Sequence, residues 1–309
     1  MLDRVTGMQV FSRVAALGSL SAAARALGMS QTMATKHMAA LEARLGVKLL
    51  HRTTRRMTLT EAGRNYLDAI ERILSELEQA DYAASAQTFK VSGTLRLNVP
   101  VSFGVREIAP LLPEFAERYL DLTVDLGLND RHIDLIEEGW DLVVRIGSLS
   151  NSTMRARRLA ACRMMVCAAP SYIAKHGAPK SISDLAAHNC LGYKLSRMAG
   201  SGQWLFGKNG HARITVSGTL KANNGDALVT AAIAGQGIVY QPIFLVAREI
   251  RAGKLAPIRL DHEPIELDGI FAAYPSDRSP PAKVRAMIWF LAEKWGRNPP
   301  WERGLNDAG

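Results

Sequence analysis

The 309-residue chain contains only three cysteines, and no two of them form the C-x-x-C pair of a redox or zinc motif. The thiols of Cys162, Cys167 and Cys190 are too few for a disulfide framework. We therefore expect buried, reduced thiols in a cytoplasmic protein. A redox-sensing pair is the alternative, and nothing in the spacing favours it.

Catalytic and cofactor-binding motifs are also lacking. The sequence contains no P-loop, no H-E-x-x-H and no G-x-S-x-G pattern, and Gly235-Gln236-Gly237 is only a fragment of a dinucleotide-binding motif. The seven histidines are scattered without the spacing of metal ligands. We expect a protein that is not an enzyme and that uses neither a metal ion nor a cofactor.

Long apolar runs are equally scarce. The one uncharged run that raises the question of a membrane span, residues 227–247, is interrupted by Gly235, Gly237 and Pro242. These residues divide it into helix, strand and helix, as in a buried α/β segment. The chain begins with an amphipathic pattern rather than with the apolar core of a signal peptide. The prediction is a cytoplasmic protein without a membrane partner.

Positive charge is concentrated at one end of the chain. Residues 1–60 contain nine Lys and Arg against two Asp and Glu, a net charge of +7. Residues 61–90 carry a net charge of −3, and the whole of the remaining chain carries only +5. A local excess of cations is typical of a module that binds a polyanion.

Residues 19–45 predict two short helices joined by a tight turn. Ser21 can cap the first helix, Gly28 can end it in the left-handed conformation, and Ser30 can cap the second helix. One face of the second helix is apolar. The opposite face carries Gln31, Thr32, Thr35 and Lys36. This is the pattern of a helix-turn-helix, whose second helix enters the DNA major groove; a helical hairpin in an ordinary core is the alternative.

A basic segment follows, and it favours the DNA-binding interpretation. Residues 49–60 read as a β-hairpin, or wing, that lays arginines along phosphates or into the minor groove. The predicted DNA contacts outside the polar face of the second helix are Ser21, Ser30, Arg52, Thr53, Arg55 and Arg56.

At this point the sequence resembles the LysR-type transcriptional regulators. The matching motifs are F-x-x-V-x-x-x-G-S at residues 11–19, A-A-R-x-L at 23–27, L-E-x-R-L-G-V-x-L-x-x-R at 41–52 and L-T-E-A-G at 59–63. The chain departs from the family at Thr32, where Pro is common, and at His37, where Gln is common. Both departures bear on the base preference.

The resemblance implies a regulator that binds double-stranded DNA as a dimer or tetramer and responds to a small-molecule effector. As an activator it would also contact RNA polymerase. A stand-alone small-molecule-binding protein is the alternative, but it leaves the basic module unexplained.

Residues 61–90 predict a long helix, started by Thr58 or Thr60, and then a hinge. The apolar residues of this helix follow a 3-4 alternation, which is typical of helix pairing between subunits. They are Leu67, Ile70, Leu74 and Leu77. Packing of the helix against its own domain is the alternative, whereas the family resemblance implies a linker helix that dimerises the DNA-binding domains.

Beyond residue 91, strands and helices alternate. Strands predicted at 94–99, 122–128 and 142–146, with helices at 103–119 and 133–138, give the βαβαβ order of a doubly wound parallel sheet. A second set of strands is predicted at 163–169, 191–193, 203–206, 214–222, 238–241 and 270–274. The accompanying helices are predicted at 172–176, 185–187, 225–234, 244–252 and 283–295.

The predicted fold class is therefore α/β. The expected parts are a winged helix-turn-helix (1–60), a linker helix and hinge (61–90), a two-lobed effector-binding domain (91–297) and a flexible tail (298–309). Lobe I would comprise residues 91–162 and 268–297, and lobe II residues 163–267. The resemblance implies that this two-lobed domain is similar to periplasmic solute-binding proteins.

Ligands of open α/β sheets bind beyond the carboxyl ends of the strands, so we expect an effector between the lobes. Ser102 and Asn224 stand where a strand passes into a helix, and a helix N-terminus is an anion site. Two such N-termini facing each other favour a small organic acid. Ser102 as a simple helix cap is the alternative. The predicted effector contacts are Ser102, Phe103, Asn129, Arg145, Ile146, Asn224, Gly225 and Gln241.

Overall fold

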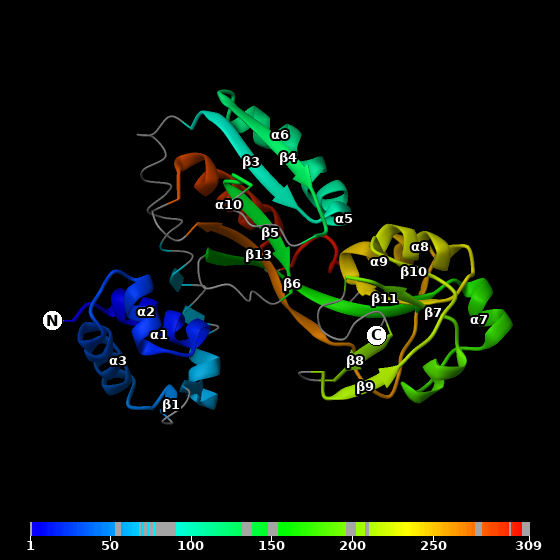
Figure 1. The fold of residues 1–309 in the computed structure, drawn as a ribbon, viewed down its shortest axis with the longest axis horizontal. Helices are drawn as coiled ribbons and strands as arrows, with labels where there is room; N and C mark the ends of the chain where they lie inside the picture. Colours follow the sequence, from blue (N-terminus) through cyan, green and yellow to red (C-terminus); the bar gives the residue numbers. More distant parts are fainter. Residues whose placement is uncertain are drawn as a thin grey trace. The chain divides into compact units, whose positions relative to one another are not determined.

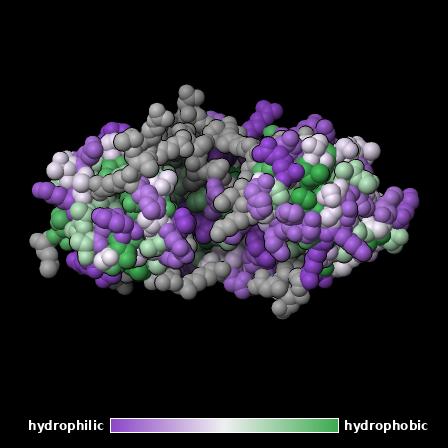
Figure 2. All heavy atoms as spheres, turned by 90° about the horizontal axis from the view of Figure 1, so that it is seen from below, coloured by the Kyte–Doolittle hydropathy of each residue, from purple (hydrophilic) through white to green (hydrophobic). Residues whose placement is uncertain are grey.

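The computed structural model describes residues 2–52, 57–67, 69–70, 73–74, 77, 91–131, 138–147, 154–195, 202–207, 210–275, 280–296 and 298–304. The chain divides into two compact units, Met1–Lys90 and Val91–Gly309. Among the described residues no helix is long and apolar enough to cross a membrane. On the face drawn in Figure 2, hydrophobic residues are interspersed among hydrophilic ones.

Three helices and a two-stranded hairpin make up the described part of the first unit before residue 60 (Figure 1). They are α1 (Arg4–Leu17), α2 (Leu20–Ala26), α3 (Gln31–Leu45), β1 (Leu50–Arg52) and β2 (Met57–Leu59). The hairpin is antiparallel, with Leu50 opposite Leu59. One hydrophobic core joins the helices and includes Met8, Phe11, Val14, Ala34, Met38 and Leu41. The predicted helix-turn-helix and its wing strands are confirmed.

The first helix of this motif is capped by Ser19 and not, as predicted, by Ser21. The Ser19 hydroxyl accepts a hydrogen bond from the Ala22 N–H at 3.3 Å, and the Ser21 hydroxyl lies 3.0 Å from it. The prediction was wrong because α2 begins at Leu20. Gly28 follows the helix with a φ of 65°, which confirms its predicted left-handed conformation.

The helix after the wing begins at residue 61. The Thr60 hydroxyl accepts a hydrogen bond from the Gly63 N–H at 2.9 Å and donates to the Lys48 carbonyl at 2.8 Å. Thr60, rather than Thr58, is therefore the residue that starts the helix. Because Lys48 directly precedes the wing, the same side chain ties the helix start to the wing.

Ile70 packs within its own unit. Its side chain is fully buried in the core of the first unit, and Leu67 and Leu74 are partly buried against that core. The prediction that Ile70 contacts a second subunit is therefore wrong. The exposed apolar residues that the structure describes on this helix are Ile73 and Leu77, with 42% and 38% exposure.

A mixed nine-stranded sheet organises the second unit (Figure 1). β3 (Gly93–Val99) lies parallel to β4 (Leu122–Leu128) and β5 (Leu142–Ile146), as the predicted βαβαβ order requires. The next two strands, β6 (Met154–Ala168) and β13 (Glu266–Pro275), are antiparallel to each other, and β13 is antiparallel to β5. The sheet as a whole is therefore mixed, not purely parallel.

β6 and β13 connect the two halves of this sheet. Residues 154–163 of β6 pair with β13, whereas residues 164–167 pair with β11 (Ile238–Pro242). The prediction began this strand only at residue 163, because the arginines in its first half break the apolar alternation. The register of β13 shifts next to Gly269, whose φ is 142°. The expected lobe boundaries thus fall within two continuous strands.

The second lobe completes its part of the sheet with β7 (Cys190–Tyr193), β10 (Lys221–Ala222) and β12 (Ala256–Pro257), and adds a hairpin of β8 (Gln203–Phe206) and β9 (Ala212–Thr215). Its helices are α7 (Pro170–His176), η3 (Ser183–Ala187), α8 (Gly225–Ile233) and α9 (Ile243–Arg251). The single strand predicted at 214–222 is wrong. Its two ends belong to β9 and β10, which lie in different sheets.

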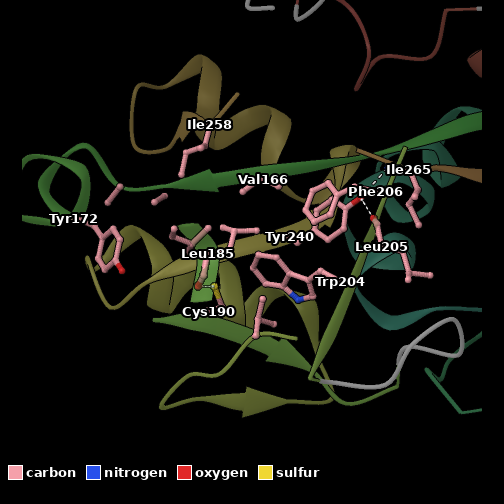
Figure 3. Packing of buried hydrophobic residues seen from close by; sticks show 14 residues of the cluster. Val166, Tyr172, Leu185, Cys190, Trp204, Leu205, Phe206, Tyr240, Ile258 and Ile265 are labelled. Carbon is pink, nitrogen blue, oxygen red and sulfur yellow. Dashed lines mark hydrogen bonds between the residues drawn. The ribbon is translucent and has the colours of Figure 1, made fainter. Parts of the chain in front are cut away.

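Tyr240 lies at the centre of the second lobe's core (Figure 3). Its hydroxyl donates to the Leu205 carbonyl at 2.9 Å and accepts from the Ile265 N–H at 2.8 Å. Its ring stacks on Phe206 with the centroids 4.9 Å apart. Because both polar partners are backbone groups of other segments, this one side chain holds β8, β11 and the approach to β13 together.

The helix predicted at 103–119 is broken into four short segments. They are α5 (Val101–Phe103), the π-helical η1 (Gly104–Ile108), the 3-10 segment η2 (Ala109–Leu111) and α6 (Leu112–Arg118). Pro110 and Pro113 interrupt it, because proline has no N–H to donate and its ring clashes with the preceding turn. The helix predicted at 133–138 lies almost wholly outside the described residues.

The C-terminal segment, residues 298–304, is packed, so the prediction of a flexible tail from residue 298 is wrong for these residues. Trp301 is 2% exposed and packs edge-on against Phe103 and against Trp295, the last residue of α10 (Ala282–Trp295). The Glu302 carboxylate accepts a hydrogen bond from Arg163 of β6 at 2.8 Å. The prediction failed because Trp301, the one aromatic residue of this segment, is buried and holds the segment against the rest of the unit.

Candidate functional site

The N-terminal half of α3 presents the predicted polar face. Gln31, Thr32 and Lys36 are exposed. Residues four positions apart lie on the same side of a helix, so Thr32 and Lys36 form one surface. Thr35 is half-buried, and its hydroxyl donates to the Gln31 carbonyl at 2.9 Å while keeping its lone pairs. The Ser30 hydroxyl caps the helix by accepting from the Met33 N–H at 3.2 Å.

Two further residues of α3 bear on this surface. Met33, next to Thr32, is 40% exposed. The sequence analysis did not include it among the DNA contacts because methionine is usually a core residue. A side chain of this kind can contact a thymine methyl group. His37, one of the departures from the family pattern, is buried and faces the core. Its substitution therefore affects packing and not the exposed surface.

Glu42 anchors the start of the wing. Its buried carboxylate accepts hydrogen bonds from the Leu49 N–H at 3.0 Å, the Leu50 N–H at 3.4 Å and the Lys48 ammonium at 2.8 Å. Burial raises the pKa of Glu42, but the bonds from Lys48 and the two N–H groups outweigh it and hold the pKa below its usual value. The L-E of the recognised motif thus places the hairpin against α3.

The remaining predicted wing contacts lie outside the described residues. They are the side chain of Arg52 together with Thr53, Arg55 and Arg56. Ser21 is half-buried and bonded to Ser19, so it stands beside a helix start without capping it.

In the second unit, Ser102 and Asn224 come together across the lobes. The Asn224 Nδ2 donates to the Ser102 hydroxyl at 3.3 Å, and the Asn224 Oδ1 caps α8 by accepting from the Ala227 N–H at 3.2 Å. Ser102 caps no helix. The first N–H of α5, that of Val101, donates instead to the Asp130 carboxylate at 2.9 Å. That helix start already has an anion, which removes one of the two N-termini predicted to attract a ligand.

Phe103 does not face an effector. Its side chain is fully buried among the rings of Phe244, Trp295 and Trp301, with centroids 5.1–5.6 Å away. The prediction was wrong because an apolar residue at a strand end can equally turn inward. Gly225 is also structural, since a Cβ there would lie 2.4 Å from Leu245 Cδ1.

The other predicted effector residues remain near the ends of their strands. Gln241 is 2% exposed, and its Nε2 has no hydrogen-bond acceptor among the described residues. Arg145 and Ile146, at the end of β5, are half-buried. Asn129 follows β4, and its Oδ1 accepts from the Arg131 N–H at 2.9 Å.

Two residues of this region were missed at the sequence level. Asn98 on β3 is 2% exposed, and its Oδ1 has no donor among the described residues. Tyr193 ends β7, and burial, with the nearby Asp130 carboxylate, raises its pKa to about 12. Their burial depends on neighbouring segments that are distant in the chain, so no local signal could identify them.

The three cysteines are free and buried, as expected. Burial raises the pKa of each thiol, that of Cys190 to about 12. Thiols react as thiolates, so a raised pKa and burial both disfavour a redox role.

Two family models together span most of the chain. Residues 5–64 match the bacterial regulatory helix-turn-helix protein, lysR family, and residues 90–296 match the LysR substrate binding domain.

Full-length relatives agree with these matches. The regulator CrgA of Neisseria meningitidis (serogroup C) is 34% identical over 94% of this chain and 97% of its own length, and DmlR of Escherichia coli is 35% identical over 97% of both. The structure of CrgA matches 94% of this chain and 99% of that chain with a TM-score of 0.73 and 33% identity. The structure of AphB of Vibrio cholerae matches 93% of this chain and 98% of that chain with a TM-score of 0.57 and 25% identity. The chain belongs to the LysR family of DNA-binding, ligand-responsive transcriptional regulators.

Proposed function

We propose that this regulator reads its operator through the exposed face of α3 formed by Gln31, Thr32, Thr35 and Lys36. The observation that carries the proposal is the exposure of this polar face on a capped helix, within residues 1–60, whose net charge is +7. The N-terminal residues of such a helix contact base edges in the major groove. Two copies would bind a pseudo-palindromic site.

Lys36→Ala tests this proposal on the full-length protein. Loss of a good base contact costs about 1–3 kcal/mol at the affected base pair. We expect operator affinity, measured by fluorescence anisotropy, to fall roughly 5- to 150-fold, while affinity for random DNA falls much less. Arg44→Ala, which removes an exposed cation at the other end of α3, serves as the control and should change both affinities by less than about threefold. Equal losses on operator and random DNA for Lys36→Ala would place Lys36 on the phosphates instead.

We further propose that the effector is a small organic anion bound where the strand ends of the two lobes meet. Arg145 supplies positive charge there. The buried Gln241 Nε2 can donate to a ligand carboxylate, and the buried Asn98 Oδ1 can accept from a hydroxyl group of the ligand. Buried donors that lack acceptors carry a desolvation cost, which a ligand would relieve. The N-terminus of α5 contributes no anion site, because the Val101 N–H already donates to the Asp130 carboxylate.

Gln241→Leu separates binding from stability at this site. Removing a buried donor without a protein acceptor should leave the unliganded protein equally stable, or more stable by up to about 1–3 kcal/mol. The melting-temperature increase caused by an organic acid, found in a thermal-shift screen, should nevertheless be lost. A variant that is destabilised yet responds normally to the acid would show that Gln241 is a structural residue.

The exposed residues Ile73 and Leu77 are our proposed contacts between linker helices. They are four positions apart, so they share one side of the helix. Unlike the buried Ile70, both side chains are exposed. The double variant Ile73→Asp, Leu77→Asp should have a smaller oligomeric state, seen in sedimentation velocity as a dimer in place of a tetramer or a monomer in place of a dimer. The free energy of unfolding of the first unit should change by less than about 0.5 kcal/mol, because both side chains are exposed. An unchanged sedimentation coefficient would place the interface elsewhere.

A further inference from the structure

The second unit contains a cavity that none of the predicted effector residues lines. It has a volume of about 160 Å³ and is formed by η1 of the first lobe, α9 of the second lobe and the C-terminal segment. Its lining includes Arg106, Glu107, Arg248, Arg251 and Trp301, none of which belongs to the predicted effector site. A cavity of roughly 150 Å³ is large enough for a ring of six carbon atoms. The space therefore suits a small molecule or ion.

Three arginines give this cavity an unbalanced positive lining. Arg106 is paired, with its Nε 2.7 Å from Asp226 Oδ1. Arg251 donates to the backbone carbonyls of Pro300, Trp301 and Arg303, which hold the guanidinium in place without neutralising its charge. Within the part of the chain that the structure describes, neither Arg248 nor Arg251 forms a salt bridge.

Among the described residues that line the cavity, Glu107 is the only one with a carboxylate. Burial raises its pKa to about 7, although Arg106 on the same segment and Arg248 and Arg251 on α9 act in the opposite direction. Asp226 and Glu249 both pair with Arg106, and Glu249 also pairs with Lys254. Near neutral pH the carboxyl is therefore partly protonated, and it can then donate a hydrogen bond into the cavity.

We propose that this cavity is a second ligand site, which binds a small oxyanion or short carboxylate against Arg248 and Arg251. The Arg248 guanidinium can bind such an anion through two parallel N–H bonds. Arg251 can add a donor from Nη1, because its Nε and Nη2 already donate to carbonyls of the C-terminal segment. The cavity's apolar walls, including Phe244 and Trp301, leave room for a short carbon chain. Because the walls come from both lobes and from the C-terminal segment, an anion bound here stabilises the observed arrangement of the lobes by mass action.

Calorimetric titration of the full-length protein with sodium sulfate and sodium acetate tests this site. Neither anion changes its charge between pH 6 and 8, and whichever binds more tightly identifies the ligand class. We expect saturable binding that is tighter at pH 6, where Glu107 is neutral, than at pH 8. The Glu107→Gln variant should bind the anion as tightly at pH 8 as at pH 6.

Arg248→Gln should weaken binding at least tenfold. Arg248 is exposed at the cavity's edge, so the variant is expected to fold normally. Arg213→Gln removes the same charge from an exposed position on β9 and should change the affinity by less than twofold. Absence of saturable binding at pH 6, or equal effects of the two variants, would overturn the proposal. A tenfold loss in Gln241→Leu with no loss in Arg248→Gln would also overturn it, by moving the anion to the effector site.

Discussion

Gly63→Ala is expected to unfold the DNA-binding unit at temperatures at which the rest of the chain stays folded. A Cβ at this position would lie 2.1 Å from the Leu49 carbonyl oxygen and 3.2 Å from the Thr60 hydroxyl. Backbone atoms cannot move aside as the end of a side chain can, so the wing must shift away from the helix. The cost should be about 3 kcal/mol or more, at the upper end for overpacking. For a unit of this size that lowers the melting temperature by roughly 12 °C or more.

Gly7→Ala is the matched control within the same unit. The added Cβ would lie 3.6 Å from the His37 carbonyl oxygen, an ordinary contact, and Gly7 stands inside α1. Alanine should therefore be neutral or stabilise the unit by up to about 1 kcal/mol. Differential scanning calorimetry measures both variants, with operator affinity as the second readout. Similar melting temperatures for the two would show that the wing does not approach Gly63 so closely in solution.

Gly63 also shows what the sequence could and could not predict. The L-T-E-A-G motif identified the place where the wing passes into the long helix, and the cap at Thr60 follows from local chemistry. The reason for the glycine is a close contact with Leu49, the first residue of the wing. This contact forms because the hairpin folds back and brings the helix start next to Leu49. Residues so far apart in sequence leave no local pattern that predicts it.

Strand prediction succeeded where polar or glycine residues flank the strand at both ends. The strands at 122–128, 142–146 and 203–206 agree with the structure to the residue, because each is a short run of strand-forming residues next to polar or glycine residues. The first half of β6 was missed because its arginines hide the alternation. The segment 214–222 was misread because two separate pairings, with β8 and with β7, share one stretch of β-branched sequence.

The candidate sites divide in the same way. Helical periodicity was sufficient to predict the exposed face of α3, since a buried stripe leaves the opposite side exposed. Periodicity does not show what an apolar residue packs against. Ile70 was therefore assigned to a subunit interface and Phe103 to the effector, whereas both pack within their own units. Asn98 and Tyr193 were missed because their burial depends on segments that are far apart in the chain.

Trp301→Ala is expected to destabilise the effector-binding unit by about 3–5 kcal/mol, the usual cost of removing a large buried side chain. The indole packs against Phe103 and Trp295 with centroid separations of 5.6 and 5.4 Å, so its loss opens a hole in an aromatic cluster. Trp301→Phe should recover part of the loss. Leu120→Ala, at a position that is 87% exposed, is the control and should change stability by less than about 0.5 kcal/mol.

The same variant also tests whether the C-terminal segment fastens the lobes to each other. Arg251 of α9 holds this segment through three carbonyls, while Phe103 of α5 holds it through Trp301. If the two contacts act together, the combined cost of Arg251→Ala and Trp301→Ala in urea unfolding should be smaller than the sum of the single costs, because either change alone already releases the segment. Additive costs would mean that each residue stabilises its own lobe independently. In that case the segment would be an ordinary part of the core, without influence on how the lobes meet.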